Sequence, residues 1–251
     1  MKKILYLFIL CMALAACHSG KERIVIEGVL KNANHEKIRL AYITSDGLCF
    51  IDSARLKDGQ FCFNIQARTE SEKSRVSTPM MYQILLSNDN TLTTIAQGGD
   101  HIRITADANN LIRGYHVEGS EEAVLVGQLD SALNVFADSA DKLLVLCQRY
   151  LEDDSVRTYI ERCYVPMTKQ HKAYLTDFIQ KHPDKMASYI ALYQSYNRCS
   201  FFEENEKLEW LKKLNEPLQK QYPNNPYLQD MQQRIEVLTL REQHQQRYDT
   251  D

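Results

Sequence analysis

The sequence predicts an α+β protein, in which an N-terminal antiparallel β-domain of the sandwich or barrel-like kind precedes an antiparallel helical segment. Two observations predict this order. Between residues 23 and 117, apolar and polar residues alternate in short runs separated by turn-forming residues, as in half-buried strands. From Ser120 onward, apolar residues recur at three- and four-residue spacing, which is typical of amphipathic helices. The breaks between these helices are short, so antiparallel packing is expected.

The first half contains the runs that we expect to form strands. They are residues 24–30, 37–43, 50–56, 61–67, 81–86, 92–96, 101–105 and 116–118. Residues 66–79 are polar and are expected to form a loop.

Asp58 and Gly59 stand between two alternating runs and predict a hairpin with a type I′ turn, because that turn needs positive φ at both central residues. This centre pairs Leu56 with Phe61 and Ala54 with Phe63. The core face of the hairpin would then hold Phe50, Ala54, Leu56, Phe61, Phe63 and Ile65. Asp52 falls on the same face, where we expect a structural carboxylate bonded to Ser53 or to a backbone amide. A second hairpin is expected around residues 97–100.

Helix signals begin at Ser120, which is expected to cap a helix whose first turn carries Glu121 and Glu122. Further helices are expected at residues 155–180, with a bend at Pro166, at 184–196 and at 203–221. Asn225 and Pro226 are suited to begin the last helix.

The N-terminus has the pattern of an export signal. A basic start at Lys2 and Lys3 precedes an apolar run, residues 4–16, that falls short of the ~20 residues needed to span a bilayer. The run ends in Leu14-Ala15-Ala16-Cys17, which resembles the bacterial lipobox. That resemblance implies a signal peptide at residues 1–16, a diacylglycerol on Cys17, and palmitate among the chains attached there. An ordinary cleaved signal and a membrane-spanning anchor are the alternatives.

Residues 17–23 would form a short lipidated tether, followed by the β-domain at 24–118 and the helical domain at 119–251. Position 18 is His18 and not Asp, the residue that resembles an inner-membrane retention signal, so the outer membrane is the expected location. The periplasmic face and the surface face of that membrane are both compatible with the sequence. The lipid bilayer, reached through acylated Cys17, is thus an expected partner.

Composition excludes some classes of partner. Removal of residues 1–16 deletes Lys2 and Lys3 and no acidic residue, so the formal net charge of −3 becomes −5. An acidic chain without a cluster of Lys and Arg is a poor partner for nucleic acid. The five cysteines that follow Cys17 are Cys49, Cys62, Cys147, Cys163 and Cys199. No two of them form Cys-x-x-Cys, and we expect buried free thiols, with one disulfide as the alternative and a Cys49–Cys62 bond disfavoured.

An ordered set of motifs carries a family resemblance. It consists of Ile26-x-Gly28, Ile38-x-Leu40, Ile51-Asp52-Ser53, Asp58-Gly59-x-Phe61-x-Phe63, Gly99-Asp100-x-Ile102-x-Ile104 and Val117-x-Gly119-Ser120. The set resembles the N-terminal β-domain of unknown function that many bacterial envelope lipoproteins carry ahead of a thioredoxin-like or peroxiredoxin-like module. Residues 182–189 are similar to the connector helices of those proteins. The Cys-x-x-Cys module that the resemblance implies is absent, so no catalytic residue is carried over. A stand-alone form is the expectation, and a truncated gene is the alternative.

Motifs for catalysis are also absent from the sequence. It has no Gly-x-Ser-x-Gly, no His-Glu-x-x-His and no phosphate-binding glycine loop. We therefore expect no catalytic residue, no metal site and no cofactor, although His101 and His116 could approach each other through the sheet. The pairs Asp153-Asp154 and Glu203-Glu204 are interpreted as helix starts or solvated acids.

Four sites match the Asp-Ser-apolar pattern, which resembles the acceptor motif of a bacterial periplasmic O-glycosylation system. The candidate acceptors are Ser131, Ser139 and Ser155, while the match at Asp52-Ser53 is assigned to the β-domain motif. Chance matches are common, and Asp154-Ser155 also suits a helix start.

Three hypotheses of function follow. The first is a membrane-anchored cell-envelope lipoprotein that is not an enzyme and serves as a binding or scaffold module for an envelope protein or a glycan. The second is an accessory to a separately encoded thioredoxin-like thiol-disulfide oxidoreductase. The third is an enzyme with a site that no sequence motif marks.

Overall fold

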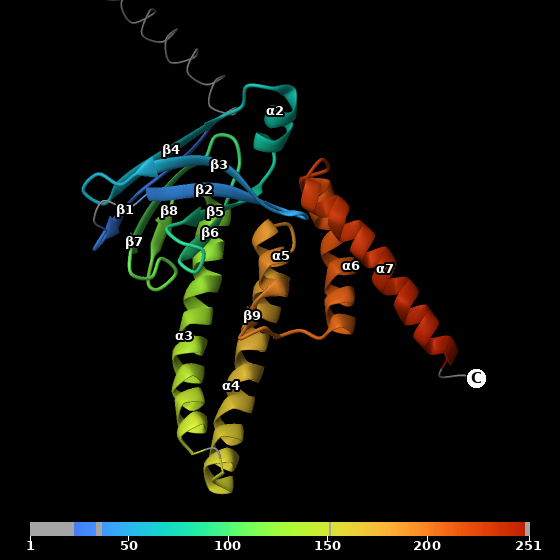
Figure 1. The fold of residues 1–251 in the computed structure, drawn as a ribbon. Helices are drawn as coiled ribbons and strands as arrows, with labels where there is room; N and C mark the ends of the chain where they lie inside the picture. The colour runs from blue at the N-terminus through green and yellow to red at the C-terminus, as the bar shows by residue number, and fades with distance from the viewer. Residues whose placement is uncertain (1–22, 34–36, 151, 249–251) are drawn as a thin grey trace, which may run out of the picture. The chain divides into compact units, whose positions relative to one another are not determined.

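The computed structural model describes residues 23–33, 37–150 and 152–248, and the side chains up to residue 243 (Figure 1). The predicted signal peptide, Cys17 and the tether lie outside the described residues. The chain divides into two compact units, one up to Val124 and the other from Leu125. The α+β prediction is confirmed, because strands fill the first unit and helices dominate the second.

Unit 1 holds two four-stranded sheets with strand orders β4-β1-β7-β8 and β3-β2-β5-β6. The strands are β1 Arg23–Lys31, β2 Lys37–Thr44, β3 Gly47–Arg55, β4 Gln60–Gln66, β5 Met80–Leu85, β6 Thr91–Ala96, β7 His101–Asp107 and β8 His116–Glu118. Alternate residues of β7 are buried, as expected of a strand with one face on the core. The fully buried side chains come from both sheets and include Ile24, Ile26, Ile38, Leu40, Phe63, Ile84, Leu92 and Ile102.

One pairing departs from the expected antiparallel pattern. Strand β1 pairs in antiparallel fashion with β4 and in parallel fashion with β7. The chain from β1 to β7 passes through the whole second sheet, and this long connection permits the parallel pairing.

The predicted Asp58-Gly59 turn is confirmed, but the hairpin that was predicted around it does not form. Asp58 has φ 53° and Gly59 φ 74°, and Lys57 and Gln60 exchange two backbone hydrogen bonds of 3.2 and 2.9 Å. Beyond that bridge the strands separate, because β3 pairs with β2 and β4 pairs with β1. The Leu56–Phe61 and Ala54–Phe63 pairs therefore do not form.

The predicted core face of that hairpin is correct in part. Leu56, Phe61 and Phe63 are buried, whereas Phe50 is 53% exposed. Asp52 is exposed as well, although its carboxylate accepts a 2.7 Å hydrogen bond from the Ser53 amide as expected. Phe50 and Asp52 were assigned to the core for the same mistaken reason, because both lie on β3, an edge strand with no buried residue.

The second predicted hairpin fails in the same way. Residues 97–100 form a turn in which the Asp100 amide donates to the Gln97 carbonyl at 3.0 Å. The flanking strands β6 and β7 belong to different sheets, so this turn also carries the chain across the core. The Asp100 carboxylate accepts from the Gln97 amide at 2.8 Å, and partial burial raises the pKa of Asp100.

The expected loop at residues 66–79 contains a helix, α2 Glu70–Val76. Thr69 caps it, because the Thr69 hydroxyl accepts from the Glu72 amide and the Glu72 carboxylate accepts from the Thr69 amide. The Thr-x-x-Glu capping box was present in the sequence and could have predicted the helix.

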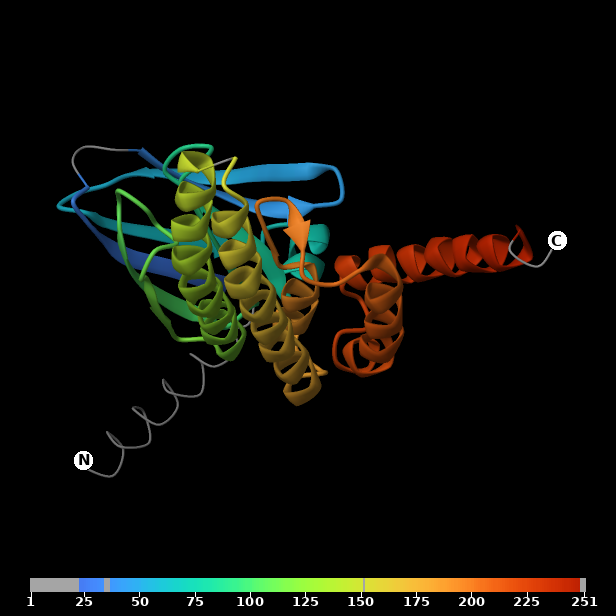
Figure 2. The same ribbon diagram turned by 90° about the horizontal axis from the view of Figure 1, so that it is seen from below.

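Unit 2 is built from helices. They are α3 Glu121–Arg149, whose first residues belong to unit 1, α4 Asp154–Lys181, α5 Met186–Tyr193, α6 Glu204–Gln221 and α7 Pro226–Tyr248. The helices α3 and α4 lie side by side in both views (Figures 1 and 2). The predicted helix starts are confirmed at α3, α4, α6 and α7, where Asp153 accepts from the Ser155 and Val156 amides and Asn225 accepts from the Tyr227 amide.

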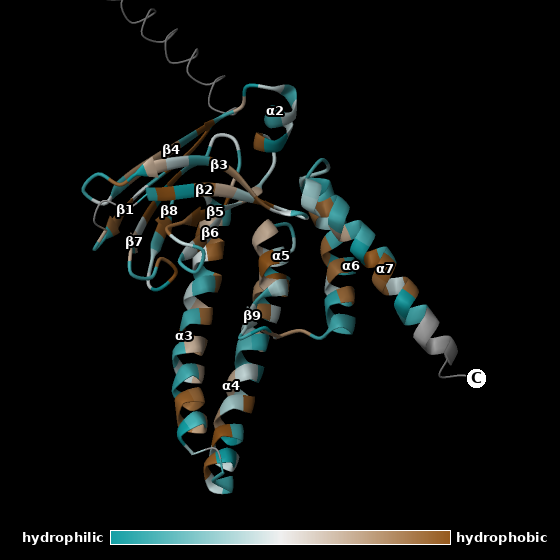
Figure 3. Ribbon diagram, viewed as in Figure 1, coloured by the Kyte–Doolittle hydropathy of each residue, from teal (hydrophilic) through white to brown (hydrophobic). Residues whose placement is uncertain are grey.

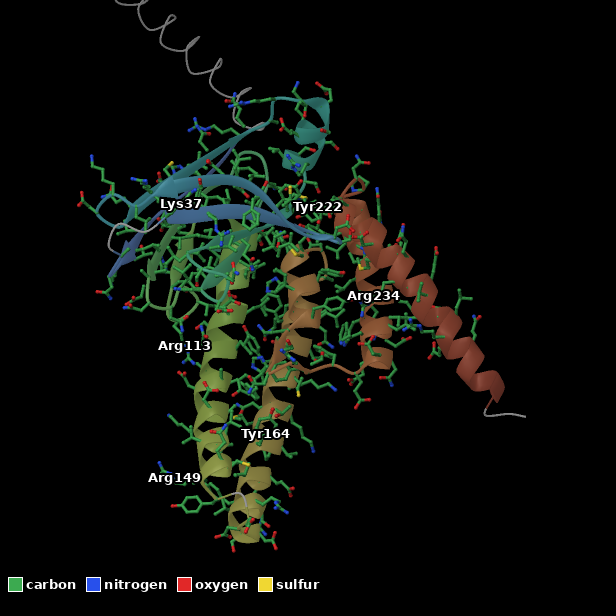
Figure 4. The ribbon with its side chains drawn as sticks, viewed as in Figure 1. Lys37, Arg113, Arg149, Tyr164, Tyr222 and Arg234 are labelled. Carbon is green, nitrogen blue, oxygen red and sulfur yellow. The ribbon has the colours of Figure 1, made fainter. Side chains whose placement is uncertain are left out.

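An aromatic cluster holds α3 and α4 together. The Phe136 ring of α3 lies 6.0 Å from Tyr164 and 5.2 Å from His171, both on α4 (Figure 4 labels Tyr164). Its other neighbours are Tyr196 at 5.4 Å and Phe201 at 5.1 Å. Tyr196 belongs to a small hairpin, β9 Ser195–Tyr196 and β10 Cys199–Ser200, which the sequence analysis assigned in part to a helix.

No helix among the described residues combines the length and the apolar character that crossing a membrane requires.

Candidate functional site

The edge strand β3 is the least buried element of unit 1. Among the described strands it pairs with β2 alone, and none of its residues is buried. Leu48, Phe50 and Ile51 are 42%, 53% and 36% exposed. An exposed edge strand presents unpaired backbone N–H and C=O groups beside these apolar side chains, so it can accept a further strand.

Basic side chains lie beside Phe50 on the same sheet. The Arg39 guanidinium carbon lies 4.9 Å from the Phe50 ring centroid, and Arg39 also donates to the Asn88 side chain at 3.3 Å. Lys37, on the same strand β2, is labelled in Figure 4. A shallow hollow of about 430 Å³ is lined by Lys37, Arg39, Phe50 and Ile51–Ser53.

Strand β4 is the matching edge of the other sheet, since β1 is its one partner among the strands that the structure describes. Because β3 and β4 meet at the Lys57–Gln60 turn and then diverge, the protein is open between them. A cavity of about 440 Å³, here called the β3–β4 cavity, lies in this opening. Its lining residues are Tyr42, Ile51, Asp52, Asn64, Ile65, Gln66, Ala67, Arg68, Glu72, Arg75, Val76 and Tyr82.

Helix α2 supplies the charged wall of the β3–β4 cavity. The Glu72 carboxylate accepts hydrogen bonds from the Arg68 and Thr69 amides at 2.7 and 3.0 Å, and these bonds lower the pKa of Glu72. Arg75 donates to the Tyr42 hydroxyl at 2.9 Å, and its guanidinium carbon lies 4.5 Å from the Tyr42 ring centroid. Glu72 is therefore held ionised and Arg75 is fixed in place.

Tyr42 joins the cavity to the exposed edge. Its hydroxyl hydrogen-bonds to the Cys49 thiol of β3, and this bond together with burial raises the pKa of Tyr42. The sequence analysis missed this group, because its members come from β2, β3 and α2 and no local pattern connects them.

The polar groups of the β3–β4 cavity suit hydrogen bonding better than bond-breaking chemistry. Asp52, Asn64 and Gln66 supply acceptors and donors from the two edge strands. Asn64 accepts from the Arg23 side chain at 2.6 Å. Among the described residues that line the cavity there is no histidine, and none is a serine or cysteine nucleophile beside a base.

A second hollow, of about 540 Å³, lies over strands β1, β4 and β7 and includes Cys62 and Arg55. Its Glu27 carboxylate pairs with His101 at 2.7 Å and with Arg103 at 3.4 Å, and the His101 contact is the main cause of the lowered pKa of Glu27. His101 and His116, which could have approached each other through the sheet, do not face each other, because His116 pairs with Thr105, four residues farther along β7.

Among the described residues, no three His, Cys, Asp or Glu side chains are grouped so that they could hold a metal ion.

All five cysteines that follow Cys17 carry free thiols in the structure. Their expected burial is wrong. Cys49, Cys62 and Cys199 are exposed, and Cys147 and Cys163 are partly exposed. Cys62 alternates with the buried Phe61 and Phe63 on β4 and therefore points to the solvent side of its sheet, whereas Cys49 lies on β3, which has no buried residue.

The candidate glycan acceptors Ser131, Ser139 and Ser155 are all exposed. Ser131 and Ser139 lie within α3, where the Ser139 hydroxyl donates to the Val135 carbonyl at 3.3 Å, and Ser155 lies in the first turn of α4. Modification of these serines stays a prediction, and the intact mass of the native protein would test it. Cys17 lies outside the described residues.

Residues 24–125 match the family described as Domain of unknown function (DUF4369). The match covers unit 1 and less than half of the chain, so it identifies an N-terminal domain of unknown function. It carries no thioredoxin-like context. No curated protein and no solved structure matches the chain.

Proposed function

We propose that this protein is a lipid-anchored lipoprotein of the bacterial cell envelope that is not an enzyme and binds a partner through unit 1. The observation that carries the proposal is the exposed edge strand β3 with Leu48, Phe50 and Ile51 beside the β3–β4 cavity. An envelope protein with an extended segment fits an open strand edge, because backbone hydrogen bonds to the edge give affinity and neighbouring pockets give specificity. A glycan is the other partner class that a cavity lined by amides and carboxylates could bind.

The anchor rests on the sequence around Cys17. Lipid on Cys17 would hold unit 1 at the membrane through a short tether, and the outer membrane is the proposed location. Palmitate is expected to label the wild type and not Cys17→Ala. Equal labelling of the two proteins would contradict the anchor without bearing on the binding role of β3.

The binding role is tested by photo-cross-linking in intact cells. A photoreactive amino acid replaces Phe50, and a matched control replaces Glu118, an exposed residue of β8 in the other sheet. A reproducible adduct is expected at position 50 and not at position 118. Mass spectrometry of the adduct then separates an envelope protein from a glycan. Absence of a reproducible adduct at position 50, or the same adducts at both positions, would overturn the proposal.

An accessory role in thiol-disulfide exchange is the second candidate, favoured by the exposed thiols of Cys49, Cys62 and Cys199. Serine at all three positions would then abolish any mixed disulfide that the wild type forms with an envelope thioredoxin-like protein. If the wild type forms no such disulfide under trapping conditions, this candidate fails.

A further inference from the structure

Helix α3 carries a stripe of exposed residues along one side. The stripe, here called the α3 stripe, consists of Ser131, Val135, Asp138, Lys142, Val145 and Arg149. The steps between them alternate between four and three residues. At roughly 100° per residue they lie within about 40° of one line along the helix, and Figure 4 labels Arg149 at the distal end of α3.

The apolar members of the stripe are unusually open to solvent. Val135 is 69% exposed and Val145 is 55% exposed. The opposite side of the same helix holds the buried Leu129, Phe136 and Ala140, and Phe136 packs against α4. The helix therefore has a covered side and, within the described residues, an uncovered side that also carries hydrophobic residues. Hydrophilic and hydrophobic residues both occur along α3 (Figure 3).

The spacing of the stripe is that of a coiled-coil seam. Steps of four and three residues place successive side chains along one contact line between two helices. The sign and position of the charges then identify the partner. If a second α3 runs antiparallel to the first and a two-fold axis passes at the level of Ala140, Val135 faces Val145 of the second copy. Asp138 then faces Lys142 of the second copy, and Ser131 faces Arg149.

We propose that the α3 stripe is a self-association surface, which pairs with the α3 stripe of a second copy of this chain in antiparallel fashion. Every contact occurs twice in such an arrangement, since a two-fold interface uses the same patch on both chains. Both ion pairs join opposite charges and both apolar contacts join valines. A membrane surface fits less well, because the stripe mixes an acid with its two basic residues.

Charge reversal tests the pairing in the full-length protein. Asp138→Lys places two lysines face to face twice, and Lys142→Asp does the same with two aspartates. Each variant alone is expected to weaken the dimer by at least about tenfold, because juxtaposed like charges oppose association. A mixture of the two variants is expected to form a heterodimer, in which every reversed charge meets its opposite.

Matched controls make the same charge changes away from the stripe. Glu216→Lys and Lys220→Asp alter exposed residues of α6, and both are expected to leave the dimer unchanged. Sedimentation of the detergent-solubilised chain gives the mass, and circular dichroism checks that each variant folds. Because Ser131 is also a candidate glycan acceptor, the intact mass of each preparation is measured first.

Cysteine cross-linking tests the register. In a chain with its five native thiols replaced by serine or alanine, Val135→Cys and Val145→Cys are prepared separately and then mixed. Oxidation of the mixture is expected to yield a covalent dimer, whereas either variant alone yields little. A monomer at every concentration, failure of the charge-reversed mixture to associate, or cross-linking of Val135→Cys with itself would overturn the proposal. The last result would indicate a parallel pair.

Discussion

Replacement of Gly59 by alanine is expected to destabilise unit 1 strongly. Gly59 has φ +74°, and a Cβ added there would stand 2.3 Å from the Leu30 carbonyl oxygen and 3.3 Å from its carbonyl carbon. The same stretch of β1 is tied to the turn, since the Leu30 amide donates to the Gly59 carbonyl at 2.8 Å. The added methyl group must therefore push the turn away from β1 or break that hydrogen bond.

Gly114 provides the matched comparison. Its φ is +67°, close to that of Gly59, but a Cβ there would meet nothing within 4 Å. Alanine at either position incurs about 1–2 kcal/mol for the left-handed conformation. In both variants, alanine also lowers the conformational entropy of the unfolded chain, and this offsets the same part of that cost. Overpacking adds about 1–3 kcal/mol at Gly59 alone, so Gly59→Ala should lower the free energy of unfolding by that much more than Gly114→Ala.

Hydrogen exchange of the backbone amides in β1 and β4 measures this difference, because β4 follows the turn, β1 pairs with β4 and contacts Gly59 through Leu30, and both strands report the opening of unit 1. Fluorescence cannot replace it, since the one tryptophan, Trp210, lies in α6 of unit 2. Equal losses of stability in Gly59→Ala and Gly114→Ala would refute the contact with Leu30. A larger loss at Gly114 would refute the whole comparison.

Three further predictions concern single side chains. Burial lowers the pKa of His171 below its ordinary 6.5, so the unfolded chain binds the proton more readily and the free energy of unfolding should fall as pH decreases below 6.5. In His171→Gln, urea unfolding followed by Trp210 fluorescence should show a smaller fall, and an unchanged pH dependence would contradict the assignment. Lys172 contacts Glu206 at 2.5 Å and lowers the pKa of Glu206. Glu206→Gln should therefore cost up to about 1 kcal/mol at neutral pH, and the same unfolding assay should show the difference vanish as pH falls below the ordinary value of 4.5. Thr69→Ala removes the cap of α2, so it should lower the stability of this helix by about 1 kcal/mol and speed the exchange of its backbone amides. Thr69→Ser keeps a hydroxyl and should not. Equal exchange rates in the two variants would argue against the capping box.

Local chemistry made several elements predictable. Asp58-Gly59 suits positive φ at two successive residues, and the turn formed as expected. The caps at Asp153 and Asn225 were also predictable, because each side chain bonds amides only two or three residues away. The capping box of α2 belongs to the same kind of signal and was overlooked because the segment is polar.

The candidate site was much less predictable. Phe50 was assigned to the core from its alternation with polar neighbours, yet alternation reports only which face of a strand a residue shares. Whether that face is covered depends on the layer that packs against it, and β3, whose one partner among the described strands is β2, has no buried residue. The group formed by Tyr42, Cys49 and Arg75 likewise joins three elements, and only their packing brings it together.

By itself, the sequence determined the succession of strands and helices, the positions of the main turns and helix starts, and the absence of the common catalytic motifs. The tertiary structure decided which strands pair. At residues 57–60 and again at residues 97–100, the chain passes from one sheet to the other. The strands on either side of these turns had been expected to pair with each other as hairpins. The physical reason is that a turn is stabilised by its own few residues. The choice of partner strand depends instead on how Phe61, Phe63 and the other apolar side chains are buried together, and those side chains are far apart in the sequence.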